Sequence, residues 1–360
     1  MSDAQESRAI LKDMLRRMLS NRQGEGDMMA RWRQLRDELG LLAAPLPEAR
    51  GGLGGGFADS ALIAEELGCW LMPVPFVATS VIAIGLFDAL SREDLSDQVV
   101  SGDILPVPAL MEDGRVMRVR PTATMLREED GVLRLRGRKE LVEDVDMASH
   151  LLVPACADRS GEPLLLLLPA ALPGMGWSRY RLLDGREAAT VVFDDITIAP
   201  DAVIGRGEAD WQRFEAVLDR AMVATCAEAL GLMRAMLGQT VDYVKQRRQF
   251  GKTIASFQVV QHRLADMLIE VEQAASVTAM AVQALPDPIA ASTAKARTSQ
   301  ALRFVAQNAV QLHGGIGTTE ELALSRYFKR AMLLETQYGS AEQHLARVER
   351  LREVERSLIG

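Results

Sequence analysis

The chain has 360 residues, of which 48% are hydrophobic and 25% are charged, so it can bury a large core and divide into two or three domains. Its formal net charge of −8 argues against a general nucleic-acid binder and against a protein that adheres to membrane surfaces. The three cysteines are far apart and show no CxxC spacing, which indicates neither a disulfide framework nor a zinc site and favours a reducing cytoplasm. The apolar runs are too short to span a bilayer, so we expect a soluble protein.

Helical spacing of apolar residues dominates the N-terminal part of the chain. Two helices are predicted within residues 7–39, and a loop rich in Gly and Pro follows through residues 51–56. Helical spacing resumes at residue 61 and continues to residue 90. Residues 1–104 are therefore predicted to form an α-helical domain.

The pattern changes in the middle of the chain, where short apolar runs are separated by Gly, Asp and Pro. The predicted strands include residues 116–119, 132–135, 151–153, 164–168 and 190–193. Residues 105–205 are therefore predicted to form a β domain.

After Asp210 the helical period returns and holds to the C-terminus. Four long helices are predicted, at residues 214–243, 257–285, 289–313 and 321–352. Residues 206–360 thus carry enough apolar surface for a helical bundle.

Two stretches of this bundle have residues suited to binding a diphosphate. The first joins two helices and reads Arg247-Arg248-Gln249-Phe250-Gly251-Lys252-Thr253-Ile254, continued by Phe257-Gln258. The second reads Gln311-Leu312-His313-Gly314-Gly315-Ile316-Gly317. A guanidinium donates paired hydrogen bonds to phosphate oxygens, and glycine lets an anion approach the backbone. Each stretch taken alone would equally suit a helix end, with cations offsetting the dipole or glycine ending the helix.

Together the two stretches resemble the acyl-CoA dehydrogenase family, which carries R-x-x-F-G-x-x-I-x-x-F-Q and Q-x-x-G-G-x-G strings at about this spacing. The order of α, β and α domains is similar to that family over nearly the whole chain. The resemblance implies an N-terminal α-helical domain, a central β-barrel domain and a C-terminal four-helix bundle. It also implies FAD-dependent α,β-dehydrogenation of an acyl-CoA thioester, with electrons passed to electron-transfer flavoprotein.

The resemblance also implies the roles of individual residues. Arg247 would hold the FAD pyrophosphate. The residues expected to line the same cofactor are Gln249, Phe250, Ile254, Phe257 and Gln258. Those expected at its adenosine and phosphate end are Gln311, Gly314 and Gly315. In the family these positions reach the flavin of a neighbouring protomer.

The residues that a protomer needs for its own active site depart from the family pattern. The usual catalytic Glu is replaced by Tyr338, and the Glu that a second subgroup uses is replaced by Ala221. An unperturbed tyrosine titrates near 10 and is a poor base at neutral pH. The family's Thr-Glu-Pro-x-x-Gly-Ser-Asp loop has no match in residues 109–115, and its flavin-facing I-T-N string is replaced by Leu141-Val142-Glu143-Asp144.

This asymmetry is similar to that of small, beta-type subunits of heteromeric acyl-CoA dehydrogenases, among them those of pimeloyl-CoA and steroid degradation. The resulting hypothesis is a subunit that lends FAD contacts to a homologous large subunit. Two alternatives stay open: a self-sufficient homo-oligomer with a relocated base, or a flavin-free acyl-CoA-binding protein. The candidate bases for the first alternative are Asp219, Glu320, Glu321 and Glu335. The four histidines are dispersed, so we expect no metal site.

Overall fold

A computed structural model describes residues 3–20, 28–112 and 120–359. The chain packs as two compact units that alternate along the sequence. The helical unit comprises Met1–Gly26, Ala44–Pro73 and Met222–Gly360, and the sheet unit comprises Asp27–Ala43 and Val74–Ala221. The three consecutive domains at 1–104, 105–205 and 206–360 divide the chain by type of secondary structure and stay a prediction.

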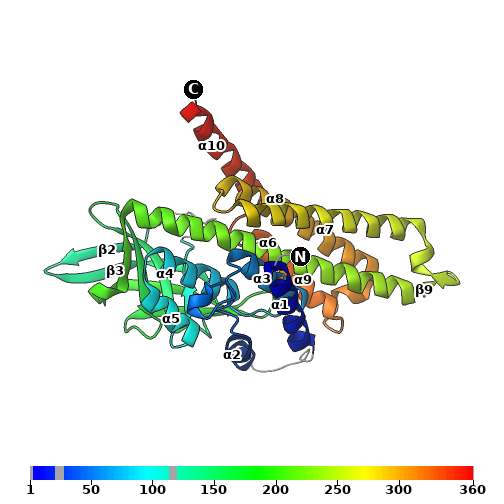
Figure 1. The fold of residues 1–360 in the computed structure, drawn as a ribbon, viewed down its shortest axis with the longest axis horizontal. Coiled ribbons are helices and arrows are strands. Elements are labelled where there is room, and N and C mark those ends of the chain that lie inside the picture. Colours follow the sequence, from blue (N-terminus) through cyan, green and yellow to red (C-terminus); the bar gives the residue numbers. More distant parts are fainter. Residues whose placement is uncertain (1–2, 21–27, 113–119, 360) are drawn as a thin grey trace. The chain divides into compact units, whose positions relative to one another are not determined.

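Long helices form most of the helical unit (Figure 1). They are α1 (Asp3–Ser20), α3 (Phe57–Cys69), the C-terminal part of α6 (Gly207–Gln246), α7 (Gln258–Ala284), α8 (Pro288–His313), α9 (Ala323–Thr336) and α10 (Ala341–Ile359). The single helix predicted over 321–352 is wrong, because the chain leaves the helical conformation between α9 and α10. Tyr338 has φ 59° and Gly339 has φ 111° at this break. The four-helix bundle therefore gains a further helix, α10, which packs against α8 and whose C-terminal end projects from the bundle in Figure 1.

The core of the helical unit is an apolar cluster to which α6, α7, α8 and α9 all contribute. Met233, Met267, Leu302 and Leu334 are fully buried members, one from each helix. By length and composition, α6 could also cross a membrane, but 72% of its most apolar window is buried inside the protein. Such burial is what a core helix shows.

Helices α3 and α6 touch backbone to backbone within the helical unit. A Cβ atom on Gly231 would lie 1.9 Å from the carbonyl oxygen of Glu65, and one on Gly68 would lie 2.1 Å from that of Glu228. Glycine is therefore the residue type that both positions require. Either helix would have to move to accept even an alanine.

Helix α1 is fastened to α3 by ion pairs with buried carboxylates. Arg8 Nε lies 3.0 Å from Asp59 Oδ1, whose side chain is 3% exposed. Lys12 and Arg16 both reach Glu66, at 3.4 and 3.0 Å. The i, i+4, i+8 spacing of these cations puts them on one face of α1.

The sheet unit consists of short helices and one mixed sheet. Its helical segments are α2 (Met28–Leu39), the π-helical Val77–Ile84, α4 (Gly85–Ala89), α5 (Glu93–Ser101) and the first part of α6. Its strands are β1 (Pro106–Pro108), β2 (Met125–Glu129), β3 (Val132–Glu143), β4 (His150–Ala157), β5 (Pro163–Pro169), β6 (Met175–Arg181), β7 (Glu187–Ile198) and β8 (Val203–Arg206).

The strand order is β6-β7-β3-β2-β4-β5-β8, with β1 added in parallel to β4. The predicted strands at 132–135, 151–153, 164–168 and 190–193 are confirmed within β3, β4, β5 and β7. The one expected at 116–119 lies outside the described residues. Among the described strands, β6 and β8 lie at the two ends of this order and do not pair with each other. The predicted closed barrel is therefore wrong, and the fold is an open sheet.

The inner face of this sheet carries the second core. Leu135, Val153, Leu166 and Val191 are fully buried members of its apolar cluster. Strand β5 buries nearly all of its side chains, which accounts for its uninterrupted leucines, whereas β3 alternates. The expected order of N-terminal helices, central sheet and C-terminal helices is thereby confirmed.

Candidate functional site

The first motif forms a hairpin where α6 ends. The backbone N–H of Arg247 still donates to the carbonyl of Tyr243 (2.9 Å), and the chain then enters β9 (Arg248–Gln249) and β10 (Lys252–Thr253). Gln249 pairs with Lys252 in antiparallel register. The two residues between the strands, Phe250 and Gly251, have φ 51° and 79°. Positive φ at both central residues is the signature of a type I′ turn.

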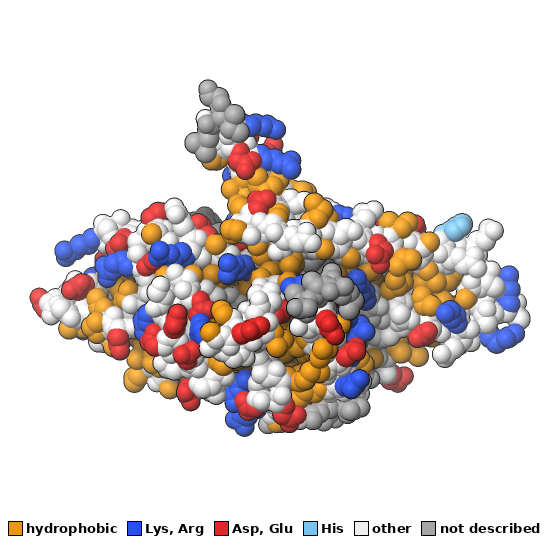
Figure 2. All heavy atoms as spheres, in the orientation of Figure 1, with side chains coloured by type: hydrophobic (Ala, Val, Ile, Leu, Met, Phe, Trp, Pro, Cys, Tyr) orange, Lys and Arg blue, Asp and Glu red, His pale blue; other side chains and the backbone are white. Residues whose placement is uncertain are grey.

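The hairpin presents its cations outward. Arg247 is exposed, and its guanidinium has no side-chain partner among the described residues. Arg248 donates to the carbonyl of Gly251 at 3.2 Å, and Lys252 Nζ lies 4.3 Å from the centre of the Phe257 ring. Figure 2 shows Lys and Arg side chains at the end of the helical unit where β9 lies. An external anion could therefore reach Arg247 without displacing a carboxylate.

The apolar members of this motif differ in exposure. Phe250 is 89% exposed and meets Phe257 edge to face, with ring centroids 6.2 Å apart. Ile254 is half-buried in the 3₁₀ turn Ile254–Ser256. Phe257 precedes α7, and Gln258 is the first residue of that helix and is exposed.

The second motif ends α8. Gln311 is exposed near the end of the helix, and Gly314 caps it with φ 67°. That positive φ explains the first glycine. Gly315 differs, because its φ is not positive and a Cβ atom there would meet nothing within 4 Å. Nothing inside the described chain requires glycine at this position, so the residue suits a close approach from outside.

The structure brings both motifs together in the helical unit. The rings of Tyr243 and His313 stack with centroids 4.3 Å apart, which joins the end of α6 to the end of α8. All nine predicted cofactor residues therefore lie on or beside these two helix ends. Their roles in binding a cofactor stay a prediction.

Tyr338, which the sequence predicts to replace the family's catalytic Glu, is turned inward. Its side chain packs against an apolar cluster that includes Met222, Val223 and Cys226. Its carbonyl accepts a hydrogen bond from His344 Nε2 at 2.8 Å. Desolvation, together with the charges of Lys295 and Arg347, outweighs the hydrogen bond to Tyr338 and lowers the pKa of His344 to about 4, so the ring is neutral at neutral pH.

A buried lysine that the sequence analysis missed supports the same segment. Lys295 Nζ donates to Ser299 Oγ (3.0 Å) and to the carbonyls of Leu334 (2.7 Å) and Glu335 (3.3 Å). Desolvation lowers its pKa to about 8. Its periodicity with the apolar residues of α8 could have revealed that it faces the core. Lys295 satisfies the last carbonyls of α9 just before the break at Tyr338.

The other candidate bases have structural surroundings. Glu320 is exposed and paired with Lys329 at 2.7 Å, and the hydrogen bond from that lysine lowers the pKa of Glu320. Glu321 is exposed, and Glu335 lies 3.3 Å from Arg303 Nη1. Asp219 is buried. Ala221, expected where a second subgroup of the family has its catalytic Glu, is fully buried in α6 and has no ionisable group.

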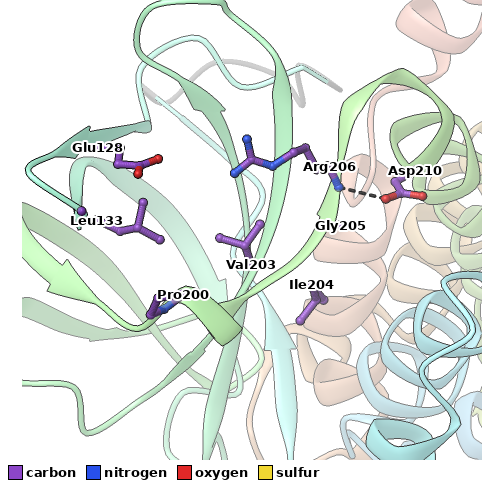
Figure 3. A pocket seen from close by; sticks show the side chains of 9 residues that line it. Glu128, Leu133, Pro200, Val203, Ile204, Gly205, Arg206 and Asp210 are labelled. Carbon is purple, nitrogen blue, oxygen red and sulfur yellow. Dashed lines mark hydrogen bonds between the residues drawn. The ribbon is translucent and has the colours of Figure 1, made fainter.

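A pocket of about 490 Å³ opens in the sheet unit beside β8 (Figure 3). Arg206 and Glu128 lie on its rim, and Leu133 and Val203 line it. Asp210 accepts a hydrogen bond from the backbone N–H of Arg206 at 2.9 Å. The pocket contains none of the predicted site residues.

Comparison with known proteins identifies the family. Residues 211–351 match the acyl-CoA dehydrogenase C-terminal domain, and residues 4–99 match the N-terminal domain. The chain belongs to the acyl-CoA dehydrogenase family. This is a family of oxidoreductases whose members are FAD flavoproteins.

Three relatives extend over most of both chains. Acyl-CoA dehydrogenase IpdE2 of Mycobacterium tuberculosis is 29% identical over 333 residues, covering 86% of this chain and 81% of the relative. A variant of the Tcur3481-Tcur3483 steroid ACAD superposes with a TM-score of 0.87 at 29% identity, covering 98% of this chain and 99% of that one. The ChsE4-ChsE5 complex from Mycobacterium tuberculosis gives 0.83 at 26% identity, with 97% of each chain covered.

In this acyl-CoA dehydrogenase, the hairpin side fits a dinucleotide. Arg247 offers a guanidinium that has no side-chain partner in the described part of the chain, and Gly315 leaves space that a Cβ atom would fill. A diphosphate needs both a fork of donors and close access to the backbone.

The stretch that replaces the I-T-N string does not fit a flavin in the same way. Leu141 adopts φ 49°, and its N–H donates to Tyr180 Oη at 3.1 Å. Glu143 lies 3.0 Å from Arg186, a guanidinium that Asp184 also contacts at 2.9 Å. The carboxylates of Glu143 and Asp184 thus pair with Arg186, in a stretch where the family pattern has neutral side chains.

Glu112, in the stretch that replaces the family's Thr-Glu-Pro loop, has likewise become part of the sheet unit. It accepts hydrogen bonds from the N–H groups of Thr122 and Ala123 (both 2.9 Å) and Thr124 (3.1 Å) and from Lys139 Nζ (2.7 Å). Desolvation raises its pKa, but the charge and hydrogen bond of Lys139 outweigh that effect and lower the pKa to about 2. Residues 113–115 of this stretch lie outside the described part of the chain.

Proposed function

We propose that this chain is a cofactor-lending subunit of a heteromeric acyl-CoA dehydrogenase. Its partner would be a homologous large subunit that carries the catalytic base. The reaction would be the FAD-dependent α,β-dehydrogenation of an acyl-CoA thioester, with electron-transfer flavoprotein as the acceptor.

One observation carries the proposal. In the two family motifs Arg247, Gln311 and Gly315 are exposed, and the Arg247 guanidinium has no side-chain partner among the described residues, whereas Tyr338, at the expected position of the base, packs against an apolar cluster. A subunit that supports its partner's site needs the first set of residues and not the second.

The bound FAD would supply the acceptor for the hydride that leaves the β-carbon of the thioester. In this chain Arg247 would donate to the diphosphate, and Gly314 and Gly315 would let the nucleotide approach the backbone. Gln311, Gln249 and Gln258 would supply further polar contacts, and Phe250, Ile254 and Phe257 apolar ones. The proton from the α-carbon would go to a carboxylate of the partner.

The relatives support a mixed assembly. Two of the solved relatives are named as pairs, Tcur3481-Tcur3483 and ChsE4-ChsE5, and the first is described as a steroid ACAD. Steroid-derived acyl-CoA thioesters are therefore the first substrates to assay.

The test is to purify the chain alone and after co-expression with an adjacent dehydrogenase gene, recording flavin absorbance and mass in solution. We expect a colourless lone chain and a yellow complex of two chain types. Arg247→Gln should lower FAD content of the complex at least about tenfold, as loss of a charge-assisted fork predicts. Arg159→Gln, the same change at an exposed residue of the β4–β5 turn, is the matched control and should have no effect.

Two results would overturn the proposal. A lone chain that binds FAD, bleaches with an acyl-CoA and loses this response on replacing one carboxylate would be a self-sufficient enzyme. A lone chain that binds an acyl-CoA and remains colourless in every complex would be a flavin-free binding protein.

A further inference from the structure

The two motifs that face the proposed cofactor are about seventy residues apart, yet one contact joins them. The Tyr243 ring stacks on that of His313 with 4.3 Å between centroids and 24° between planes. Tyr243 Oη also donates to the carbonyl of His313 at 3.3 Å. Tyr243 lies one helical turn before Arg247, and His313 immediately precedes Gly314.

His313 is itself held from two sides. Its Nδ1 lies 2.8 Å from the carbonyl of Ala309, so Nδ1 carries the proton in the neutral ring. A Cβ atom on Gly317 would lie 3.0 Å from His313 Cβ and 2.9 Å from the Val310 carbonyl. The backbone at Gly317 therefore packs closely against His313, whose side chain is buried.

The pair lies at the ends of α6 and α8, where His313 is buried and Tyr243 is half-buried. Exposed backbone follows on both sides, in the β9–β10 hairpin and in the turn Gly314–Thr318. The contact between the two rings therefore joins the segments that carry the two motifs.

We propose that Tyr243 and His313 are positioning residues that fix the distance between Arg247 and the Gly314–Gly315 turn, so that both can hold one dinucleotide. The inference rests on the proposed function. Neither ring needs to touch the cofactor. Tyr243 orients the last turn of α6 and hence the guanidinium of Arg247. The hydrogen bond from Tyr243 Oη fixes the His313 carbonyl, which directly precedes Gly314.

The test is a double-mutant cycle in the co-expressed complex, with FAD affinity measured by fluorescence titration after removal of the bound flavin. Tyr243→Leu and His313→Leu should each raise the dissociation constant about tenfold, and the double variant should be no worse than either single one. Tyr243→Phe keeps the ring and loses only the hydroxyl, so most of the affinity should return. Phe304→Leu, an exposed aromatic residue on α8, is the control and should leave affinity unchanged.

The outcomes separate this inference from the proposed function. If Arg247→Gln weakens FAD binding and Tyr243→Leu does not, the positioning role is wrong and the subunit proposal stands. If neither variant changes FAD binding, both are wrong. If the losses at Tyr243 and His313 simply add, or Tyr243→Phe is as poor as Tyr243→Leu, the stack does not fix the spacing. Should Tyr243→Leu fail to fold, the FAD affinities of Tyr243→Phe and His313→Gln are compared instead. Tyr243→Phe should bind FAD nearly as well as the wild type and His313→Gln about tenfold more weakly; equal affinities would show that the stack has no positioning role.

Discussion

Two aromatic residues of the helical unit adopt a left-handed backbone conformation, and their side chains have opposite surroundings. Phe250, with φ 51°, stands 89% exposed at the tip of the hairpin. Tyr338, with φ 59°, packs against the apolar cluster around Cys226. A bulky residue at positive φ is strained by about 1 to 3 kcal/mol, so surrounding interactions must hold each backbone in this conformation.

The different surroundings of the two side chains show where contacts within the chain offset the cost of the positive φ. At Tyr338, packing and the hydrogen bond from His344 offset the cost inside the chain. At Phe250 the type I′ turn sets the positive φ, and among the described residues the ring makes an edge contact with Phe257. The fold therefore buries the strained residue at Tyr338, whereas the ring of Phe250 remains accessible to a ligand.

The largest effect is expected at Glu112, a second residue that the fold holds by contacts within the chain. Glu112→Gln removes the charge that pairs with the buried Lys139. Breaking a buried ion pair costs about 3 to 5 kcal/mol, so the free energy of unfolding should fall by that amount. Glu140→Gln is the control, on the same strand as Lys139, because Glu140 pairs with the exposed Arg138 and should contribute below about 1 kcal/mol. Chemical denaturation measures both, and equal small losses would show that the Glu112 cluster is not structural.

The segment after α9 should also respond to pH through His344. Its pKa is lowered from 6.5 to about 4, so on acidification the unfolded chain takes up a proton before the folded one. The free energy of unfolding should therefore fall by about 3 kcal/mol as pH drops from 6.5 to 4. Burial lowers the pKa of His150 and His313 as well, so the measured quantity is the difference between wild type and His344→Gln. Identical pH profiles for the two proteins would contradict the prediction.

A smaller effect is expected at the glycine beside Tyr338. Gly339 has φ 111°, and a Cβ atom there would lie 2.8 Å from His344 Nε2. Gly339→Ala should thus destabilise the protein by about 2 kcal/mol. Gly238→Ala is its counterpart, since Gly238 lies within α6 with nothing near its Cβ, and should stabilise by up to about 1 kcal/mol. Thermal unfolding compares the two, and a loss at both positions would point to a different cause.

The smallest predicted change, at Phe250, would separate stability from binding. Phe250→Asn gives the Asn-Gly pair that a type I′ turn prefers, so stability should rise by about 0.5 to 1 kcal/mol. FAD affinity of the co-expressed complex should fall at the same time. If affinity is unchanged, the exposed ring has no role in cofactor binding.

Much of the fold followed from local patterns. Helices α6, α7 and α8 carry sustained helical periodicity, and β3, β4, β5 and β7 carry short apolar runs, so their existence was predictable, whereas β6 was missed because its sequence is largely polar and exposed. The break between α9 and α10 was not, because positive φ at Tyr338 depends on packing against distant residues. Barrel closure was wrong because strand spacing says nothing about whether the edges β6 and β8 meet.

The candidate site divides in the same way. The residues of the two motifs were identifiable because they are contiguous in sequence and have a family pattern. The stack of Tyr243 on His313 and the carbonyl contacts of Lys295 join residues that are far apart in the chain. Such contacts exist only once helices are packed, so no local pattern could indicate them.

The two buried lysines have a practical consequence. Lys139 lies in the sheet unit and Lys295 in the helical unit, and both are nearly inaccessible to solvent. An amine-reactive label can modify either one only after its own unit has opened. The rates at which the two lysines are labelled would therefore show whether the units open together or one before the other.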